Sequence, residues 1–162
     1  MGSVVAKFHK VPEEEFNKVN DEAVDYSEIQ IPKRSTKGSA GYDFVSTVDL
    51  SLAPGETALV RTGICCEIQE GWFLLLAPRS GLGFKFRMQL DNTVGIIDQD
   101  YYGNPDNFGH IMVKVTNDGK SGKTLNIKKG EKFVQGIFLP YGLAEGDDTN
   151  SERLGGFGST GK

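Results

Sequence analysis

Four short polar segments interrupt the apolar stretches of this sequence, and together they carry the residue types that bind and cleave a phosphate ester. The segments are residues 40–43 (AGYD), 78–83 (PRSGLG), 91–101 (DNTVGIIDQDY) and 153–162 (RLGGFGSTGK). In the second segment, Arg79 has a planar guanidinium that can donate two hydrogen bonds to phosphate oxygens. Further hydroxyl groups, and glycines that let backbone N–H groups approach an anion, are Ser80, Gly81, Gly158, Ser159 and Thr160.

Asp98 is the candidate general base. It follows Ile96 and Ile97, so we expect it at the end of an apolar strand, held rigidly and partly desolvated, as suits a base aimed at water. Tyr101 and Phe157 supply the flat faces that a nucleobase or a sugar needs. The set fits a nucleotide with several phosphates and a metal ion bound mainly through those phosphates. Taken singly, each segment also fits a structural role as a turn, a hairpin corner or a disordered tail.

Two glycine-lysine pairs look like parts of a phosphate-binding P-loop, but neither has the required context. From Gly156 the sequence follows the Walker A spacing as far as Lys162, yet no Ser or Thr and no helix follow that lysine. Residues 122–124 (GKT) have the right ending, but Asn117 stands where the first glycine is required. A P-loop nucleotidase is therefore not expected.

The elements that must position these residues are predicted to be short strands separated by turns. Alternation places Ile111, Val113 and Val115 on one face of a strand over residues 110–116. The other predicted strands are residues 57–68, the apolar run 71–78, and two within residues 123–140 with a turn at Lys129 and Gly130.

The N-terminal part of the chain has a different pattern. Residues 11–23 predict a short helix, because Pro12 and three acidic residues suit a first turn, and residues 25–38 predict a loop or an edge strand. Because no long segment of helical period follows residue 30, the pattern favours an all-β sandwich or jelly roll.

Composition excludes several classes of function. The chain has 162 residues, enough for one domain with a core, and a net charge of −4. A mildly acidic chain without a basic block is a poor candidate for binding nucleic acid or a membrane surface. No apolar run approaches a signal peptide or the roughly 20 residues of a membrane span, so we expect a cytoplasmic protein, or a nuclear one in a eukaryote.

The cysteines and histidines do not suggest a metal site or a nucleophile. Cys65 and Cys66 are adjacent and would point to opposite faces of a strand, so we expect buried, unpaired thiols in a reducing compartment. His9 and His110 lie too far apart in the sequence for zinc-ligand spacing, and a hydrolase triad based on His110 is not favoured.

Together with residues 130–138, the four polar segments resemble the five motifs of the homotrimeric dUTP pyrophosphatase (dUTPase) family. In order, the matching stretches are AGYDF, PRSGLGFK, DNTVGIIDQDYYG, GEKFVQGIF and RLGGFGSTG. The resemblance runs from about Pro32 to the end and implies a distorted jelly roll of β-clip type, with a short helix or two and a flexible C-terminal arm. We therefore expect an N-terminal extension over residues 1–31, a β domain over 32–142 and the arm over 143–162.

The resemblance implies hydrolysis of dUTP to dUMP and pyrophosphate, which keeps uracil out of DNA and supplies dUMP for dTMP synthesis. Asp98 resembles the base that orients water for in-line attack on the α-phosphorus. Asn92, with the hairpin that contains Gly95 and Ile97, resembles the uracil pocket, and Tyr101 resembles the residue that packs against deoxyribose and rejects a 2′-hydroxyl.

The phosphate-binding side of the site is implied in the same way. The residues that resemble phosphate ligands are Arg79, Ser80, Gly81 and Gln135. Asp43 resembles an acid that supports the phosphates and Mg²⁺, and it completes the implied catalytic set of Asp98, Arg79 and Gln135. The family holds Mg²⁺ through the triphosphate and water, so no side-chain ligand is expected.

In the family the C-terminal arm closes over a site built between the subunits of a homotrimer. Phe157 would stack over uracil, and the residues that would grip the distal phosphates are Arg153, Gly158, Ser159 and Thr160. The last motif is one residue shorter than usual, which affects the placement of Arg153. The turn after Tyr101, residues 102–110 (YGNPDNFGH), is longer than usual. Its residues 105–107 fit a surface loop or a contact with a neighbouring subunit, and we expect the loop.

Two other functions fit the same resemblance. A dCTP deaminase, or a bifunctional deaminase–dUTPase, would need a further glutamate at the cytosine edge, and residues 110–116 contain none. A nucleotide-responsive regulatory binding protein would use the arm to signal its ligand to a partner, and the long turn and the N-terminal extension are the features that could serve it.

Overall fold

The computed structural model describes residues 2–19 and 22–161. Within them the chain is mostly β-sheet with two short α-helices, as expected for an all-β fold. The strands in chain order are β1 (Ala6–Lys10), β2 (Lys33–Arg34), β3 (Tyr42–Val45), β4 (Leu50–Leu52), β5 (Thr57–Ile68), β6 (Trp72–Pro78), β7 (Met88–Leu90), β8 (Gly95–Ile97), β9 (Ile111–Asn117), β10 (Leu125–Ile127) and β11 (Lys132–Pro140). The helices are α1 (Glu13–Asn17) and α2 (Ser80–Phe86), with single 3₁₀ turns at Tyr26–Glu28 and Gln99–Tyr101.

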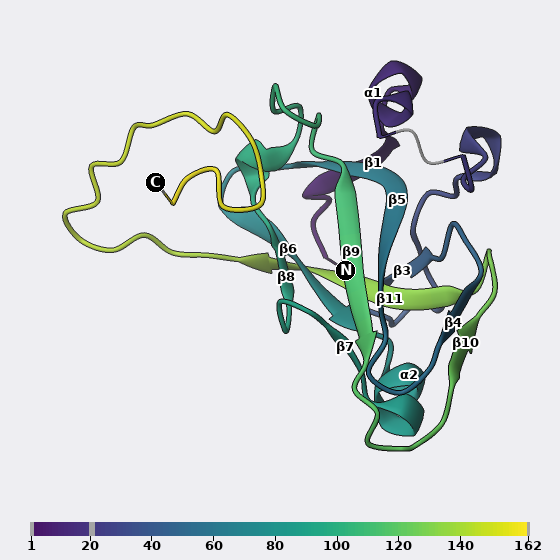
Figure 1. Ribbon diagram of the computed structural model, residues 1–162. Coiled ribbons are helices and arrows are strands. Elements are labelled where there is room, and N and C mark those ends of the chain that lie inside the picture. Colours follow the sequence, from purple (N-terminus) through teal and green to yellow (C-terminus); the bar gives the residue numbers. More distant parts are fainter. Residues whose placement is uncertain (1, 20–21, 162) are drawn as a thin grey trace.

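The strands form two larger antiparallel sheets and one strand pair (Figure 1). One sheet has the order β1-β5-β9-β7, the other has the order β2-β3-β11-β6-β8, and β10 pairs with β4. Phe8 of the first sheet contacts the rings of Tyr42, Phe44 and Phe138 in the second sheet. The two sheets therefore share one core, as in a β-sandwich.

Strand β9 has the one-sided burial that the sequence predicts. Ile111, Val113 and Val115 are all buried, while Lys114 between them is exposed, so the predicted one-sided burial is confirmed. Its neighbour β5 spans the predicted residues 57–68 and has a register shift between Arg61 and Ile64. Alternation is lost there, because that stretch is buried on both faces.

The shift in β5 depends on Gly63. This glycine has φ +72°, and a Cβ there would lie 2.3 Å from the side chain of Ile29. Its N–H donates to Nε2 of the buried His110, at 2.9 Å. Burial lowers the pKa of His110 to about 4, so this imidazole is neutral and acts as an acceptor rather than as a base.

Both cysteines are buried and unpaired, as expected. Burial raises the pKa of Cys65 to about 11 and that of Cys66 to about 12, so neither is a thiolate nucleophile at neutral pH. Among the described residues no helix is long and apolar enough to cross a membrane.

The N-terminal region departs from the predicted pattern. The helix expected over residues 11–23 is a single five-residue turn, α1, and residues 20 and 21 lie outside the described residues. Ahead of it the sequence analysis missed β1, which pairs along its whole length with β5. Helix α2 was also missed, because a segment with two glycines has low helix propensity.

The C-terminal segment, yellow in Figure 1, extends away from the end of β11 and turns back toward the loop before β9. The described part of residues 141–161 contains no helix or strand. Its last residues contact the protein around Asp98 and Tyr101, so the arm lies over one end of the sandwich.

Candidate active site

The predicted base, Asp98, directly follows the edge strand β8. Ile97 of β8 pairs with Leu74 of β6, and Gly95 pairs with Leu76. A Cβ at Gly95 would lie 2.9 Å from Cβ of Leu76, so only glycine allows this close pairing. The Asp98 side chain is 52% exposed, so about half of it is accessible to water in the single chain. The reason is that β8 has a neighbouring strand on one side only.

A cavity of about 220 Å³ lies beside Asp98. This volume is below the roughly 300–1,000 Å³ of typical small-molecule pockets. Residues of the arm line one side of the cavity. The predicted site residues that line it together are Asn92, Gly95, Ile97, Asp98, Tyr101, Arg153 and Phe157.

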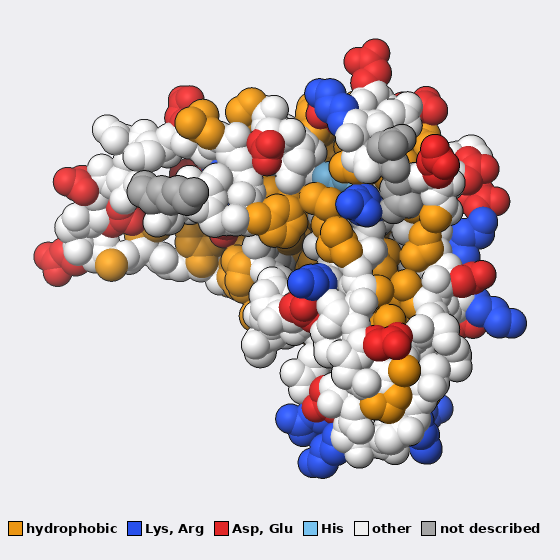
Figure 2. Space-filling view, in the orientation of Figure 1, with side chains coloured by type: hydrophobic (Ala, Val, Ile, Leu, Met, Phe, Trp, Pro, Cys, Tyr) orange, Lys and Arg blue, Asp and Glu red, His pale blue; other side chains and the backbone are white. Residues whose placement is uncertain are grey.

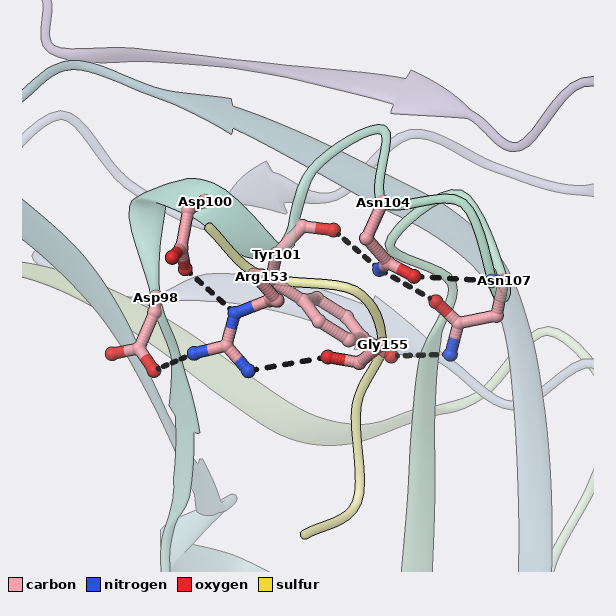
Figure 3. A network of polar contacts seen from close by, with 7 residues as sticks. All are labelled: Asp98, Asp100, Tyr101, Asn104, Asn107, Arg153 and Gly155. Carbon is pink, nitrogen blue, oxygen red and sulfur yellow. Dashed lines mark hydrogen bonds and ion pairs between the residues drawn. The ribbon is translucent and has the colours of Figure 1, made fainter. Parts of the chain in front are cut away.

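Arg153 links the arm to the base (Figure 3). Its Nη2 lies 2.7 Å from Oδ2 of Asp98, and its Nε lies 2.6 Å from Oδ1 of Asp100. Only 16% of the Arg153 side chain is exposed. The hydrogen bond to Asp100, together with the charges of Asp100 and Asp98, raises the pKa of Arg153. In this structure Arg153 holds two carboxylates, a contact that the motif resemblance did not suggest.

Tyr101 forms a buried wall of the cavity, with 7% of its surface exposed. Its hydroxyl donates to the backbone oxygen of His110 at 2.7 Å and accepts from Nδ2 of Asn107 at 2.9 Å. Burial raises the pKa of Tyr101, so the hydroxyl keeps its proton. Gly156 of the arm lies against the ring, and a Cβ there would be 2.7 Å from Cε2 of Tyr101.

A second group of predicted residues surrounds Asp43 on β3. Nε of Arg79 lies 3.0 Å from Oδ1 of Asp43, while Nζ of Lys132 and Oγ of Ser35 lie 3.2 and 2.5 Å from Oδ2. Burial by itself would raise the pKa of Asp43. The hydrogen bonds from Ser35 and Lys132 and the charges of Arg79 and Lys132 outweigh it, so the pKa is lowered. Asp43 is thus a carboxylate that orients Arg79.

Gln135 belongs to this second group because β11 pairs with both β3 and β6. It lies opposite Asp43 on one side and Ala77 on the other, and its Nε2 donates to the oxygen of Pro78 at 3.3 Å. Gly41 lies close beside it, since a Cβ there would lie 2.3 Å from Oε1 of Gln135 and the amide would have to move. Ser80 and Gly81 follow Arg79 as the first residues of α2.

The two groups lie at different ends of β6. Asp98 follows the residue paired with Leu74, whereas Arg79 comes five positions after Leu74 along the same strand direction. At about 3.3 Å per residue along a strand, the Cα atoms of Asp98 and Arg79 are therefore roughly 15–20 Å apart. The arm residues Gly158, Ser159 and Thr160 are exposed, and within the described residues no hydrogen bond joins them to either group. Lys162 lies outside the described residues.

Sequence reasoning missed several residues of the site. Lys132 and Ser35 appear only through the pairing of β11 and β2 with β3, although Lys132 lies within the fourth motif-like segment. Asp100 and Asn107 were also missed. Within residues 2–19 and 22–161, no group of three or more His, Cys, Asp or Glu side chains is arranged to hold a metal ion.

Comparison with known proteins gives a consistent result. A family model described as dUTPase matches residues 27–161. The deoxyuridine 5′-triphosphate nucleotidohydrolase of Lactococcus lactis subsp. lactis is 47% identical over 135 residues, which cover 82% of this chain and 89% of that protein. The enzyme of the same name from Nautilia profundicola is 39% identical over 150 residues, covering 90% and 96%.

Among solved structures, the dUTPase from Streptococcus mutans superposes with a TM-score of 0.68 at 35% identity, covering 86% of this chain and 98% of that chain. This agreement supports the predicted jelly-roll type of fold. The family match covers most of the chain, and it contains both groups of residues that the structure assembles around Asp98 and Asp43. The chain therefore belongs to the dUTPase family.

Proposed function

We propose that this protein hydrolyses dUTP to dUMP and pyrophosphate. The observation that carries the proposal is the cavity that is lined by Asp98, by Tyr101 and by the arm residues Arg153 and Phe157. A carboxylate, a flat wall and a closing segment are the parts that water activation on a nucleotide requires.

Asp98 is the proposed base. Arg153 engages Oδ2 of Asp98, which leaves Oδ1 to bind the attacking water. In the reaction the water oxygen bonds to the α-phosphorus, and the bond from that phosphorus to the bridging oxygen breaks. The water proton passes to Asp98, and pyrophosphate leaves with the electron pair of the broken bond. Catalysis of this kind depends mainly on positioning and on charge stabilisation.

The hairpin between β7 and β8 is proposed to read the base. Asn92 supplies a side-chain amide, and the backbone near Gly95 and Ile97 supplies further donors and acceptors for the edge of uracil. Gly95 is pressed against Leu76, so the strand cannot retreat to admit a 5-methyl group. Steric exclusion has to supplement binding, since one methyl group is worth only about 1–3 kcal/mol in a pocket.

The group around Asp43 is proposed to bind the phosphates. Arg79, Ser80 and Gly81 present a guanidinium, a hydroxyl and a backbone N–H at the start of α2, with Gln135 beside them. Mg²⁺ would be held by phosphate oxygens and water and would neutralise charge on the leaving pyrophosphate. Asp43 supports this environment by holding Arg79 and Lys132 in place.

The separation of the two groups supports a site shared between subunits. The backbone positions of Asp98 and Arg79 in one chain lie roughly 15–20 Å apart along β6, and the Arg79 guanidinium is engaged by Asp43 at its end of the strand. A complete site therefore places the Asp98 group of one copy beside the Arg79 group of another, in the homotrimer that is typical of the family. Figure 2 shows apolar side chains gathered over the middle of the face that presents β9. Leu59 of β5, which pairs with Lys114 of β9, is 42% exposed. Such a surface fits burial between copies.

The reaction is tested by measuring pyrophosphate release from dUTP, dTTP, dCTP and UTP with Mg²⁺, for the wild type and for Asp98→Asn. We expect hydrolysis of dUTP alone, reduced at least about 100-fold in the variant. Absence of pyrophosphate release from dUTP would refute the proposal, and ammonia release from dCTP would indicate a deaminase.

Sharing of the site is tested by mixing two inactive variants, Asp98→Asn and Arg79→Ala, under conditions that exchange subunits. If each site takes the two residues from different chains, random reassembly restores about a quarter of the sites. If both residues act within one chain, the mixture stays inactive. The Asp98→Asn protein mixed with itself is the matched control.

A further inference from the structure

The long turn that follows Tyr101 is more than a surface loop. Asn104 within it is only 5% exposed, and Gly109 closes it with φ +83°. A Cβ at Gly109 would lie 2.6 Å from the backbone oxygen of Tyr101, so no other residue fits without movement. The turn is thus packed directly on the residue that forms the cavity wall.

Two asparagines brace this turn from inside (Figure 3). Nδ2 of Asn104 donates to the backbone oxygen of Tyr101 at 2.7 Å and to Oδ1 of Asn107 at 2.8 Å. Oδ1 of Asn104 accepts from the backbone N–H groups of Asp106 and Asn107, and Oδ1 of Asn107 accepts from the N–H of Gly109. These bonds fix the position of the Asn107 amide.

The nitrogen of the Asn107 amide then reaches the cavity wall. Its Nδ2 donates a hydrogen bond to the hydroxyl of Tyr101, and that hydroxyl donates a hydrogen bond to the backbone oxygen of His110. His110 is in turn held by the N–H of Gly63. The Tyr101 ring is therefore anchored at its far end by two hydrogen bonds as well as by its backbone.

We propose that Asn107 is a positioning residue for sugar selectivity, which anchors the Tyr101 ring so that it cannot yield to a 2′-hydroxyl. The inference rests on the proposed function, in which Tyr101 packs against the deoxyribose. An apolar pocket rejects an added hydroxyl only weakly, by about 100-fold, if its walls can adjust. A wall held by fixed hydrogen bonds excludes the larger sugar more strongly, because a shift of the ring would break them.

The test compares kcat/KM for dUTP and for UTP in the wild type, Asn107→Ala, Tyr101→Phe and the double variant. We expect the ratio of dUTP to UTP to fall about five- to tenfold in Asn107→Ala and at least as far in Tyr101→Phe. In the Tyr101→Phe background the further change Asn107→Ala should leave the ratio unchanged, because the hydroxyl partner is already gone. Asn126→Ala on the exposed edge of β10 is the matched control and should keep the wild-type ratio.

A structural defect alone would lower both rates together and leave the ratio intact, which would overturn the proposal. If Asn107→Ala does not fold, Tyr101→Phe decides whether anchoring of the ring sets the ratio, since it removes the bonds of the hydroxyl to Asn107 and His110 and leaves the bonds within the turn. A wild type that turns over neither nucleotide would refute the proposed function. The ratio of dUMP to UMP affinities, measured by calorimetry on the same four proteins, would still decide the role of Asn107.

Discussion

Gly156→Ala should open the C-terminal arm. A Cβ at this position would lie 2.7 Å from Cε2 of Tyr101 and 3.5 Å from its Cζ and hydroxyl oxygen. The ring cannot retreat, because Asn107 and His110 hold its hydroxyl and it is buried on other sides. The added methyl group must therefore lift the arm away from the cavity.

The magnitude follows from the size of the overlap. Carbon atoms in contact are about 3.5–4.0 Å apart, so the methyl group would be about 1 Å too close. Overpacking of this kind costs about 1–3 kcal/mol, and each 1.4 kcal/mol changes an equilibrium about tenfold. If the closed arm is needed for turnover, kcat/KM for dUTP falls about five- to 100-fold.

The assay is pyrophosphate release at low dUTP concentration, together with the rate of trypsin cleavage after Arg153. Gly142→Ala is the matched control, because a Cβ there meets nothing within 4 Å and the residue has no left-handed φ. This control also reports the small entropic effect of replacing glycine in an irregular segment, about 0.4–1 kcal/mol. If Gly156→Ala stays within about twofold of Gly142→Ala in both measurements, the arm does not rest on Tyr101 during turnover.

Three further predictions concern the arm, a buried histidine and the metal ion. Deletion of residues 155–162 should leave the oligomer and the unfolding temperature unchanged but remove most dUTP hydrolysis, because the described hydrophobic core ends at Val134; size-exclusion chromatography and pyrophosphate release check this. Stability should fall as the pH drops from about 6.5 toward 4, by at most about 1.4 kcal/mol per pH unit, because the unfolded state binds a proton that the buried His110, with its pKa lowered to about 4, does not. Urea unfolding at pH 7 and pH 5 should show this loss in the wild type and a smaller loss in His110→Asn. EDTA should abolish hydrolysis while the unfolding temperature of the free protein stays constant, because the proposed Mg²⁺ is held by the triphosphate; an unfolding temperature lowered by EDTA would indicate a structural metal site instead.

Much of the strand pattern could be predicted because local burial decides it. In β9 the buried positions alternate with Met112, Lys114 and Thr116, and the alternation is visible in the sequence. β1 was missed because its residues are half polar and it becomes a strand only by pairing with β5. For α2, tertiary context overrides the low helix propensity of Gly81 and Gly83.

The residue types of the site could be predicted, but not their grouping. Asp43 and Gln135 are far apart in the sequence and become neighbours through the register of β3 and β11. Lys132 joins them for the same reason. Asn107 looks like an ordinary turn residue, and only the closed turn shows that its amide reaches Tyr101. Which of these residues become neighbours is decided by contacts between distant parts of the chain, and a local sequence pattern does not predict such contacts.

The exposure of Asp98 shows how the parts of the proposed site depend on one another. Charge stabilisation in a reaction is strongest where water is excluded, yet this carboxylate stands half exposed beside an edge strand. Arg153 partly covers it with a cation that also binds Asp100, so the arm restores some of the enclosure that the sheet does not provide. Arg79 lies at the far end of β6, so it does not reach the remaining open side of Asp98 in the same chain. A second copy that brings its Arg79 to this side would add a wall and a phosphate-binding cation, so the proposed assembly would strengthen the charge stabilisation that the proposed chemistry needs.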